Sequence, residues 1–402
     1  MSSRPSRTQP TRDEFRALAR DYSVVPLWRE VLADQTTPVS AFLRLAADEP
    51  GFLLESVEHG DRWGRWSFVG RRPAVTFVAR DGKLTVDAQV DASIRLDEGV
   101  LAALEDVLAL YRAPDLAELP PLHSGVIGYL GYDVVREVEH LPEIPTDDRA
   151  LPDAVFSVIS ELAAYDHWAQ RAVLIANAWV PAGATEEELD RQYDEAEARL
   201  DSLEAAGARP LDEPLMPVPS RNEALPEVRR TVASEDFCRA VEVAKEHILA
   251  GDIFQVVLSQ RFDLDPLDAD PFDVYRVLRQ VNPSPYMYFL RHPEVTVVGS
   301  SPEPMVQLLD GRVISRPIAG TRRRGATEEE DRRLGGELRE NPKEVAEHVM
   351  LVDLARNDVG RVVRFGTETV DELMTLERYS HVMHLTSEVS GDLAEGKTPI
   401  DV

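Results

Sequence analysis

A proline-rich stretch near the middle of the chain constrains its architecture more than any other feature. Five prolines interrupt residues 208–227. Each removes a backbone N–H and disfavours a helical conformation in the residue before it. We therefore expect a linker, taken as residues 208–230, which separates an N-terminal region, residues 11–207, from a C-terminal region, residues 231–402.

The charge balance narrows the classes of partner. The 402 residues include 44 Lys and Arg and 72 Asp and Glu, which gives a formal net charge of −28. A field of this sign repels nucleic-acid phosphates and anionic lipid, so we expect no nucleic-acid and no membrane partner. The single cysteine, Cys238, excludes an intrachain disulfide, a thiolate metal cluster and a CxxC redox site. With no apolar signal segment visible, we expect a cytoplasmic protein.

The N-terminal region has the pattern of an antiparallel sheet. Short β-prone runs alternate with clusters of Gly, Asp and Arg, at residues 52–56, 66–69, 74–79 and 83–86. Glycines spaced three residues apart in 125–133 predict close backbone approach. Residues 156–165 and 171–179 predict a hairpin of two long strands. A capping box at residues 185–188 then opens an amphipathic helix that Gly207 ends.

The C-terminal region mixes helices and strands without regular alternation. Ser234 is expected to cap a helix that ends at Gly251, and Asn341 one that ends near Ala355 with Val345, Val349 and Val352 on one face; Thr327 opens a further helix. The predicted strands are residues 254–261, 285–291, 295–299 and 312–316. This order favours an α+β fold in which antiparallel sheets form a sandwich-like core that helices flank. We expect the chain to form two intimately packed parts.

Generic catalytic motifs are absent from the sequence. There is no GxxxxGK[ST], GxSxG or HExxH, and no GxGxxG that opens a helix after a strand. Acids and histidines do gather beside turns between residues 299 and 384. Taken singly, each reads as a solvated charge or a buried structural residue, so spacing alone does not assign a reaction.

Five segments taken together resemble anthranilate synthase component I, a family of chorismate-utilising enzymes. They are LLES at 53–56, NPSPYMYFL at 282–290, GSSPE at 299–303, RPIAGT at 316–321 and ENPKEVAEHVMLVDLARNDVGRV at 340–362. The resemblance covers nearly the whole chain from Thr11 onward. It implies that the region before the linker is the tryptophan-regulatory part and that the region after it is the chorismate-binding catalytic domain.

The resemblance implies a reaction and its components. The family aminates chorismate with ammonia and eliminates pyruvate to give anthranilate, the first committed step of L-tryptophan biosynthesis. Mg²⁺ neutralises the substrate carboxylate, a glutamine amidotransferase subunit (component II) supplies the ammonia, and L-tryptophan inhibits by feedback. We therefore expect a lyase with Mg²⁺ as cofactor.

Motif matches also imply the role of individual residues. Glu347 matches a Mg²⁺ ligand, and Gly320 and Thr321 match the turn that contacts chorismate. Glu303 matches the acid near the departing ring hydroxyl. His384 matches the histidine beside the ring, where pyruvate is later eliminated.

Two positions separate the branches of the family. Relatives that add water to chorismate carry a lysine base where this chain has Gln255, which we include among the catalytic positions. Relatives that make 4-amino-4-deoxychorismate carry a nucleophilic lysine where this chain has Ala319. The absence of both lysines favours direct amination. The alternatives are a 2-amino-2-deoxyisochorismate-type synthase and a catalytically dead tryptophan-binding fragment.

The feedback site is expected at Ser56 together with Pro285, Tyr286 and Met287, which match the family's tryptophan-binding residues. The family continues past the position of Val402, with further chorismate contacts and a second acidic Mg²⁺ ligand. The resemblance therefore leads us to expect a C-terminally truncated chain that is inactive alone but able to bind tryptophan.

Overall fold

The computed structural model describes residues 8–57, 64–211, 215–218, 226–264, 269–379 and 381–402. The chain divides into two compact units, each described here by itself. One comprises Met1–Glu213 with Leu278–Val402, and the other comprises Pro214–Val277. No helix among the described residues is long and apolar enough to cross a membrane.

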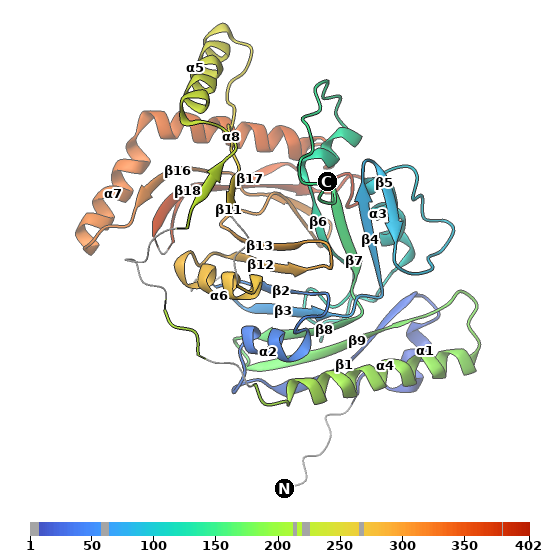
Figure 1. The fold of residues 1–402 in the computed structure, drawn as a ribbon. Helices are drawn as coiled ribbons and strands as arrows, with labels where there is room; N and C mark the ends of the chain where they lie inside the picture. The colour runs from blue at the N-terminus through green and yellow to red at the C-terminus, as the bar shows by residue number, and fades with distance from the viewer. Residues whose placement is uncertain (1–7, 58–63, 212–214, 219–225, 265–268, 380) are drawn as a thin grey trace. The chain divides into compact units, whose positions relative to one another are not determined.

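A seven-stranded antiparallel sheet forms the centre of the larger unit (Figure 1). Its order is β1-β9-β8-β3-β2-β12-β13, with bounds Val24–Leu32, Arg171–Trp179, Glu161–Asp166, Trp66–Arg71, Gly51–Glu55, Tyr286–Arg291 and Thr296–Ser301. Because β2 pairs with β12, strands from before and after the proline-rich stretch share one sheet. The division at residues 208–230 remains a prediction.

Helices cover the outer face of this sheet. The helix α4 packs on β1 and β9, α2 packs on β2 and β3, and α1 packs on α4. Their bounds are Glu186–Gly207, Pro38–Leu45 and Arg12–Leu18. The capping box predicted for α4 is confirmed, since the Thr185 side chain accepts a hydrogen bond from the Glu188 backbone N–H and the Glu188 carboxylate accepts one from the Thr185 N–H.

A four-stranded antiparallel sheet adds a second layer. Its order is β5-β4-β7-β6, with bounds Lys83–Val86, Val75–Arg80, Ala154–Val158 and Val126–Leu130. The helix α3 (Val100–Leu110) packs with this sheet in one core, where Phe77 and Phe156 stack with ring centroids 4.7 Å apart. A short 3₁₀ helix, Tyr132–Glu137, follows β6. The close approach predicted from the glycine spacing is confirmed at Gly128, where a Cβ atom would lie 2.0 Å from the Val155 carbonyl oxygen.

One predicted strand belongs to two sheets. Residues 156–165 were expected to form a single long strand, but Ile159 and Ser160 separate β7 from β8. At this bend the Ile159 N–H donates to the Gly125 carbonyl and the Asn177 N–H donates to the Ser160 carbonyl. The chain therefore passes from one sheet to the other without burying unpaired backbone groups. The two sheets joined at this bend form the sandwich-like core of the predicted α+β fold.

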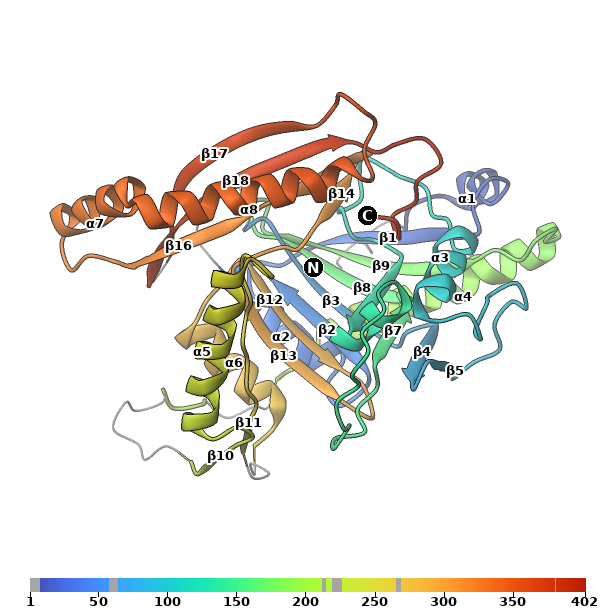
Figure 2. The ribbon, with the colours of Figure 1, turned by 90° about the horizontal axis from the view of Figure 1, so that it is seen from above.

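A five-stranded antiparallel sheet carries three of the predicted site residues, Gly320, Thr321 and His384. The strand β18 pairs with β15, β16 and β17, and β14 pairs with β15. The bounds of β14 to β18 are Gln307–Leu309, Arg312–Ser315, Ile318–Arg323, Thr369–Arg378 and Val382–Asp392. Two helices, α7 (Glu328–Glu340) and α8 (Pro342–Gly360), pack on this sheet (Figure 2).

The helix α8 begins as predicted but buries a partly different face. The Asn341 side chain caps it, as Thr327 caps α7, and α8 continues to Gly360 instead of ending near Ala355. Of the predicted face, Val352 is buried, whereas Val349 is 50% exposed, so the prediction is wrong at Val349. The buried positions are His348, Val352, Ala355 and Val359, which recur at helical spacing.

The smaller unit contains α5 (Ser234–Ala250), the pair β10 (Val228–Arg230) and β11 (Phe262–Leu264), and most of α6 (Pro271–Val281). Ala233, not Ser234, occupies the cap position of α5, whereas Gly251 ends the helix in the left-handed region as predicted. The strand predicted at residues 254–261 is wrong. A strand needs a partner for its backbone, and in this unit only residues 262–264 pair with β10.

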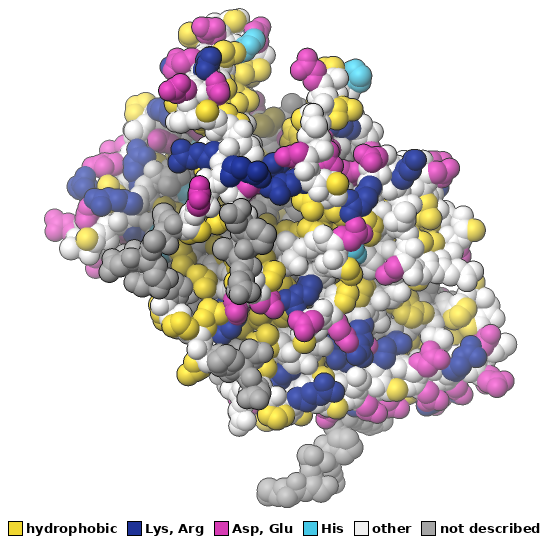
Figure 3. Space-filling view, viewed as in Figure 1, with side chains coloured by type: hydrophobic (Ala, Val, Ile, Leu, Met, Phe, Trp, Pro, Cys, Tyr) yellow, Lys and Arg dark blue, Asp and Glu magenta, His cyan; other side chains and the backbone are white. Residues whose placement is uncertain are grey.

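Charged residues on the surface are mixed, and basic side chains lie among acidic ones on the face shown in Figure 3.

One ion pair is buried inside the larger unit. Arg71 Nε lies 2.7 Å from Glu161 Oε2, with the two side chains 4% and 3% exposed. The same guanidinium donates to the Leu45 carbonyl and to Ser202 Oγ. Arg71 thereby connects β3 and β8 to α2 and α4.

We predict that Glu161→Gln destabilises the larger unit by about 3–5 kcal/mol, because it leaves a buried guanidinium without its counter-charge. The matched control is Glu30→Gln, which removes an acid from an exposed pair with Arg171 at 2.9 Å. The control should change stability by less than about 1 kcal/mol. Urea unfolding monitored by circular dichroism measures both, and equal losses in the two variants would contradict the prediction.

Candidate active site

A bulge in β16 forms the centre of the candidate site. The register of the β16–β18 pair shifts between Ala319 and Thr321, and Gly320 between them has φ +69°. A Cβ atom at Gly320 would lie 3.0 Å from Leu338 Cδ1 and 3.1 Å from Glu344 Oε2. Both the positive φ and the close approach of α7 and α8 therefore favour glycine here.

His384 lies beside this bulge in a defined orientation. It is directly opposite Thr321 in the β16–β18 pair. Its Nδ1 is 3.0 Å from the Gly320 carbonyl oxygen and 3.1 Å from Thr321 Oγ1. Because a carbonyl oxygen only accepts, Nδ1 carries a proton and donates it to Gly320. In the neutral imidazole, Nε2 then has the free lone pair.

Glu303 lies in the exposed loop after β13, near the start of β16. Its N–H donates to Ser301 Oγ at 3.2 Å, and the Ser301 hydroxyl donates back to the Glu303 carbonyl oxygen at 3.1 Å. Partial desolvation raises the pKa of the Glu303 carboxyl group, and a hydrogen bond from the Ile318 backbone opposes this effect. A raised pKa increases the fraction of the acid that is protonated near neutral pH.

Glu347 lies in the first half of α8, one turn after Glu344. Its side chain is 33% exposed, and Lys343 Nζ approaches it only to 4.0 Å. Glu344 is instead paired with Arg322 at 3.2 Å. Among the described residues, no three His, Cys, Asp or Glu side chains gather as a complete metal site. A single accessible carboxylate of this kind fits Mg²⁺, which keeps several waters and uses few protein ligands together with substrate oxygens.

His348 has a different environment from its neighbour Glu347. It is fully buried, its Nε2 lies 2.7 Å from Ser387 Oγ, and burial lowers its pKa. The Ser387 hydroxyl also accepts the Met374 backbone N–H. His348 therefore fastens α8 to β18 and β17 as a neutral structural residue.

A second group of predicted residues meets at the ends of β2 and β12. The Val57 N–H donates to the Ser284 carbonyl at 3.2 Å, so Ser56 lies beside the start of β12, where Pro285, Tyr286 and Met287 follow. The Ser56 hydroxyl oxygen is buried and has no hydrogen-bond partner among the described residues. Burial raises the pKa of Tyr286. A buried hydroxyl in need of a partner is suited to a polar group of a ligand.

Gln255 lies in an irregular segment after α5, in the smaller unit. Each unit is described by itself, so the position of Gln255 relative to the other predicted residues is left open. Ala319 lies on β16, buried and opposite Leu385. The contribution of Gln255 to the site remains a prediction.

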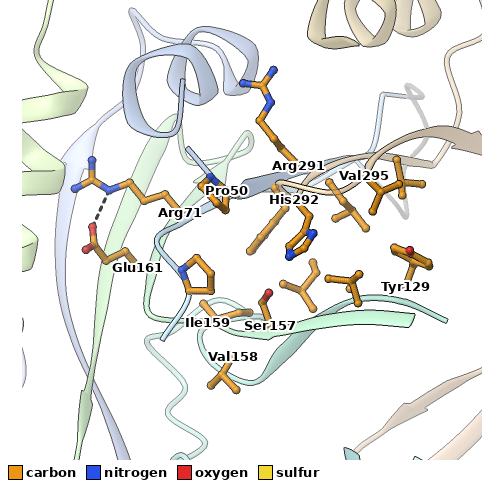
Figure 4. A pocket seen from close by; sticks show the side chains of 18 residues that line it. Pro50, Arg71, Tyr129, Ser157, Val158, Ile159, Glu161, Arg291, His292 and Val295 are labelled. Atoms are coloured by element: carbon orange, nitrogen blue, oxygen red, sulfur yellow. Dashed lines mark hydrogen bonds and ion pairs between the residues drawn. The ribbon is translucent and has the colours of Figure 1, made fainter. Parts of the chain in front are cut away.

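A cavity in the larger unit is distinct from both groups of residues. It lies between β2 with β12–β13 and the four-stranded sheet, and His292 points into it (Figure 4). Its volume of about 50 Å³ is room for very few water molecules and too small for a substituted six-membered ring. None of the predicted site residues lines it.

Sequence reasoning missed three residues on the His384 face of the sheet. Arg316 Nη2 donates to Glu377 Oε1 at 2.6 Å, and Tyr379 Oη donates to Glu377 Oε2 at 2.8 Å. The Tyr379 ring contacts the His384 ring edge-on, with centroids 5.5 Å apart. Arg316 belongs to the RPIAGT segment at 316–321. Glu377 and Tyr379 lie far from it in the sequence, and the pairing of β17 with β18 brings them close to it.

Comparisons with known proteins identify the family of the chain. Residues 50–402 match the family described as chorismate binding enzyme. Anthranilate synthase component 1 of Mycolicibacterium smegmatis is 47% identical over 398 residues, which cover 97% of this chain and 75% of that protein. The protein of the same name from Thermus thermophilus is 47% identical over 379 residues, with 94% and 77% covered.

A solved structure is similar along most of the chain. The crystal structure of anthranilate synthase component I from Streptococcus pneumoniae has a TM-score of 0.68 and 30% identity, and the match covers 92% of this chain and 78% of that one. The family match spans both sides of the proline-rich stretch, as the shared seven-stranded sheet requires. The chain therefore belongs to the chorismate-binding enzymes and, among them, to the anthranilate synthase component 1 proteins.

Proposed function

We propose that this protein is the large subunit of an anthranilate synthase, a lyase that aminates chorismate with ammonia and eliminates pyruvate in the first committed step of L-tryptophan biosynthesis. One observation carries the proposal. In a chain of this family, the β16 bulge brings Gly320 and Thr321 against His384, with Glu303 beside the start of the same strand.

Glu303 is proposed as the acid that assists the departing ring hydroxyl. Replacing that hydroxyl with ammonia requires a proton on the leaving oxygen. A carboxyl group with a raised pKa remains protonated to a greater extent near neutral pH and donates that proton. The local turn through Ser301 holds the carboxyl-bearing loop beside β16.

Gly320, Thr321 and His384 are proposed to bind and orient the ring. The hydrogen bond from His384 Nδ1 to the Gly320 carbonyl leaves Nε2 as the nitrogen that faces a substrate. Nε2 is then able to accept a proton when the ring becomes aromatic and pyruvate leaves. Thr321 Oγ1 stands 3.1 Å from the same imidazole and adds a hydroxyl for the substrate.

Mg²⁺ is the proposed cofactor, and Glu347 is the residue of this chain proposed to hold it. When bound, the cation neutralises the carboxylate of chorismate. The Glu347 carboxylate is 33% exposed and lies 4.0 Å from Lys343 Nζ, and its accessibility supports this assignment. The site would be completed by substrate oxygens and water.

The feedback site is proposed at Ser56, Pro285, Tyr286 and Met287. The Ser56 hydroxyl, which has no hydrogen-bond partner among the described residues, provides a polar anchor, and the half-buried Tyr286 ring provides an aromatic wall. Together they suit an amino acid with an indole side chain, L-tryptophan.

The ammonia source is proposed to be a glutamine amidotransferase subunit, anthranilate synthase component II. The only cysteine of the sequence, Cys238, is exposed on α5, and no hydrogen bond among the described residues activates its thiol as a glutaminase nucleophile would require. A free exposed thiol also suits a reducing compartment, so we place the protein in the cytoplasm.

The test of the proposal is anthranilate fluorescence from chorismate, ammonium and Mg²⁺. A fluorescent product that matches anthranilate by mass supports it. A non-fluorescent aminated product that retains the pyruvyl group supports a 2-amino-2-deoxyisochorismate-type synthase instead. Tryptophan binding without any turnover supports a non-catalytic tryptophan-binding protein.

We predict that Ser56→Phe raises the tryptophan concentration needed for half-inhibition by at least about tenfold, because the bulkier ring occupies the space beside Tyr286. Such a change costs tryptophan about 1.4 kcal/mol of binding free energy. Ammonia-dependent turnover should stay near wild type. Inhibition curves in an active preparation measure both, and an unmoved curve excludes Ser56 from the inhibitor site.

We also predict that Glu347→Gln raises the Mg²⁺ concentration needed for half-maximal activity by at least about tenfold, since the amide keeps the shape but lacks the charge that a hard cation prefers. The matched control is Glu337→Gln on α7, where the acid is about half exposed and is paired only with Arg333. Identical Mg²⁺ titrations for the two variants would assign Glu347 to the helix surface.

A further inference from the structure

The half of α8 that carries Glu347 is held to the sheet by a single buried side chain. His348 is the only buried residue among residues 342–350, all of which are described. The second half of the helix instead packs in an apolar cluster that includes Val352 and Val359. Apolar contacts have no preferred direction. The first half of α8 therefore depends on polar contacts for its orientation.

The imidazole of His348 meets the hydroxyl of Ser387. Its Nε2 lies 2.7 Å from Ser387 Oγ, and the same Oγ accepts the Met374 backbone N–H at 2.9 Å. The hydroxyl has one hydrogen, and Nε2 is the only acceptor for it among the described residues. Ser387 therefore donates to Nε2, and Nδ1 carries the proton of the neutral imidazole.

Ser387 joins α8 to the two strands of the proposed chorismate pocket. Its backbone N–H donates to the Pro317 carbonyl at 3.1 Å, directly before β16 and three residues ahead of Gly320. Ser387 itself lies on β18, three residues after His384. It thus holds α8 through its side chain and the start of β16 through its backbone. The shortest buried connection from Glu347 to this pocket passes through Ser387.

Two unfavourable features accompany this contact. Met374 has φ +53° at a register shift of β17, a strained backbone for a residue other than glycine, and its N–H faces Ser387 Oγ. The buried Nδ1 of His348 has no hydrogen-bond partner among the described residues, a cost that an apolar side chain would avoid. Both features indicate a contact that does more than stabilise the fold.

The orientation of His348 determines where Glu347 points. Consecutive helix residues leave the axis about 100° apart, so fixing one side chain fixes the direction of the next. An ion pair between Glu344 and Arg322 also links this half of α8 to β16. Its two long side chains are able to follow a small rotation of the helix. The short, buried bond between His348 and Ser387 is not.

We propose that His348 is a positioning residue for the metal site. Its bond to Ser387 sets where the Glu347 carboxylate lies relative to Gly320 and His384. His348 acts through Glu347 and does not touch the cation. The inference rests on the proposed function, since it takes Glu347 as the Mg²⁺ ligand.

The test is Mg²⁺ affinity, measured by calorimetry with saturating chorismate and without ammonium, so that substrate oxygens are present but no amination occurs. His348→Leu keeps a similar volume but has no acceptor for Ser387. We expect it to raise the Mg²⁺ Kd at least about tenfold, as for other groups that orient a metal ligand. His348→Gln offers an amide oxygen as acceptor and should keep the Kd within about threefold of wild type.

A second variant and a matched control accompany this measurement. Ser387→Ala should raise the Kd as His348→Leu does, and the double variant should raise it no further, because both remove the same bond. The control is Thr386→Val. Thr386 is as buried as Ser387, but its hydroxyl donates to the Thr375 carbonyl on β17, at 3.3 Å. This control should leave the Mg²⁺ Kd unchanged, while urea unfolding compares the stability of all variants.

The outcomes separate the inference from the proposed function. If His348→Leu and Ser387→Ala bind Mg²⁺ as wild type does, the positioning role is overturned and the proposed function stands. The positioning role is also overturned if Thr386→Val weakens Mg²⁺ binding equally, or if His348→Gln binds as weakly as His348→Leu. If the wild-type protein binds no Mg²⁺ in the presence of chorismate, the proposed metal assignment fails together with this inference.

Discussion

The pairing of β2 with β12 is the constraint on which the rest of the structure depends. It joins Gly51–Glu55 to the strand that begins at Tyr286, so segments separated by a proline-rich stretch become neighbours in one sheet. The end of β2 then places Ser56 beside residues 284–287. The same β12 leads through β13 to the loop of Glu303. Loss of this pairing would separate the residues proposed for the feedback site from one another and from the five-stranded sheet.

The five-stranded sheet depends on a second local constraint, the bulge at Gly320. Because the register of β16 shifts there, the Gly320 carbonyl reaches His384 on one side while its Cα packs near Leu338 and Glu344 on the other. A regular strand would not turn its carbonyl toward the imidazole in this way. The strand thus fixes the tautomer of His384 through its backbone.

The sequence predicted the elements whose signals are local. The capping boxes and caps at Thr185, Thr327 and Asn341 are present in the structure, because each depends on residues within one helical turn. The strand predicted at 254–261 is wrong although its residues are β-prone, because a strand needs a partner that no local pattern reveals. The His384 face was likewise beyond prediction, since Glu377 and Tyr379 reach it only through the register of β17 on β18.

The arginines that follow Thr321 show why the proposed chemistry needs a cation. In the sequence they form a run of three basic residues, in a chain of net charge −28. In the structure Arg322 pairs with Glu344, Arg323 with Glu330 and Arg324 with Asp331. The pairs with Arg324 and Arg378 hold the pKa of Asp331 at about 2, so that carboxylate remains charged at any physiological pH. These arginines therefore fasten β16 to α7 and α8, with their charges already balanced by acids. A dicarboxylate such as chorismate would then draw positive charge from elsewhere, which agrees with the proposal that Glu347 holds Mg²⁺.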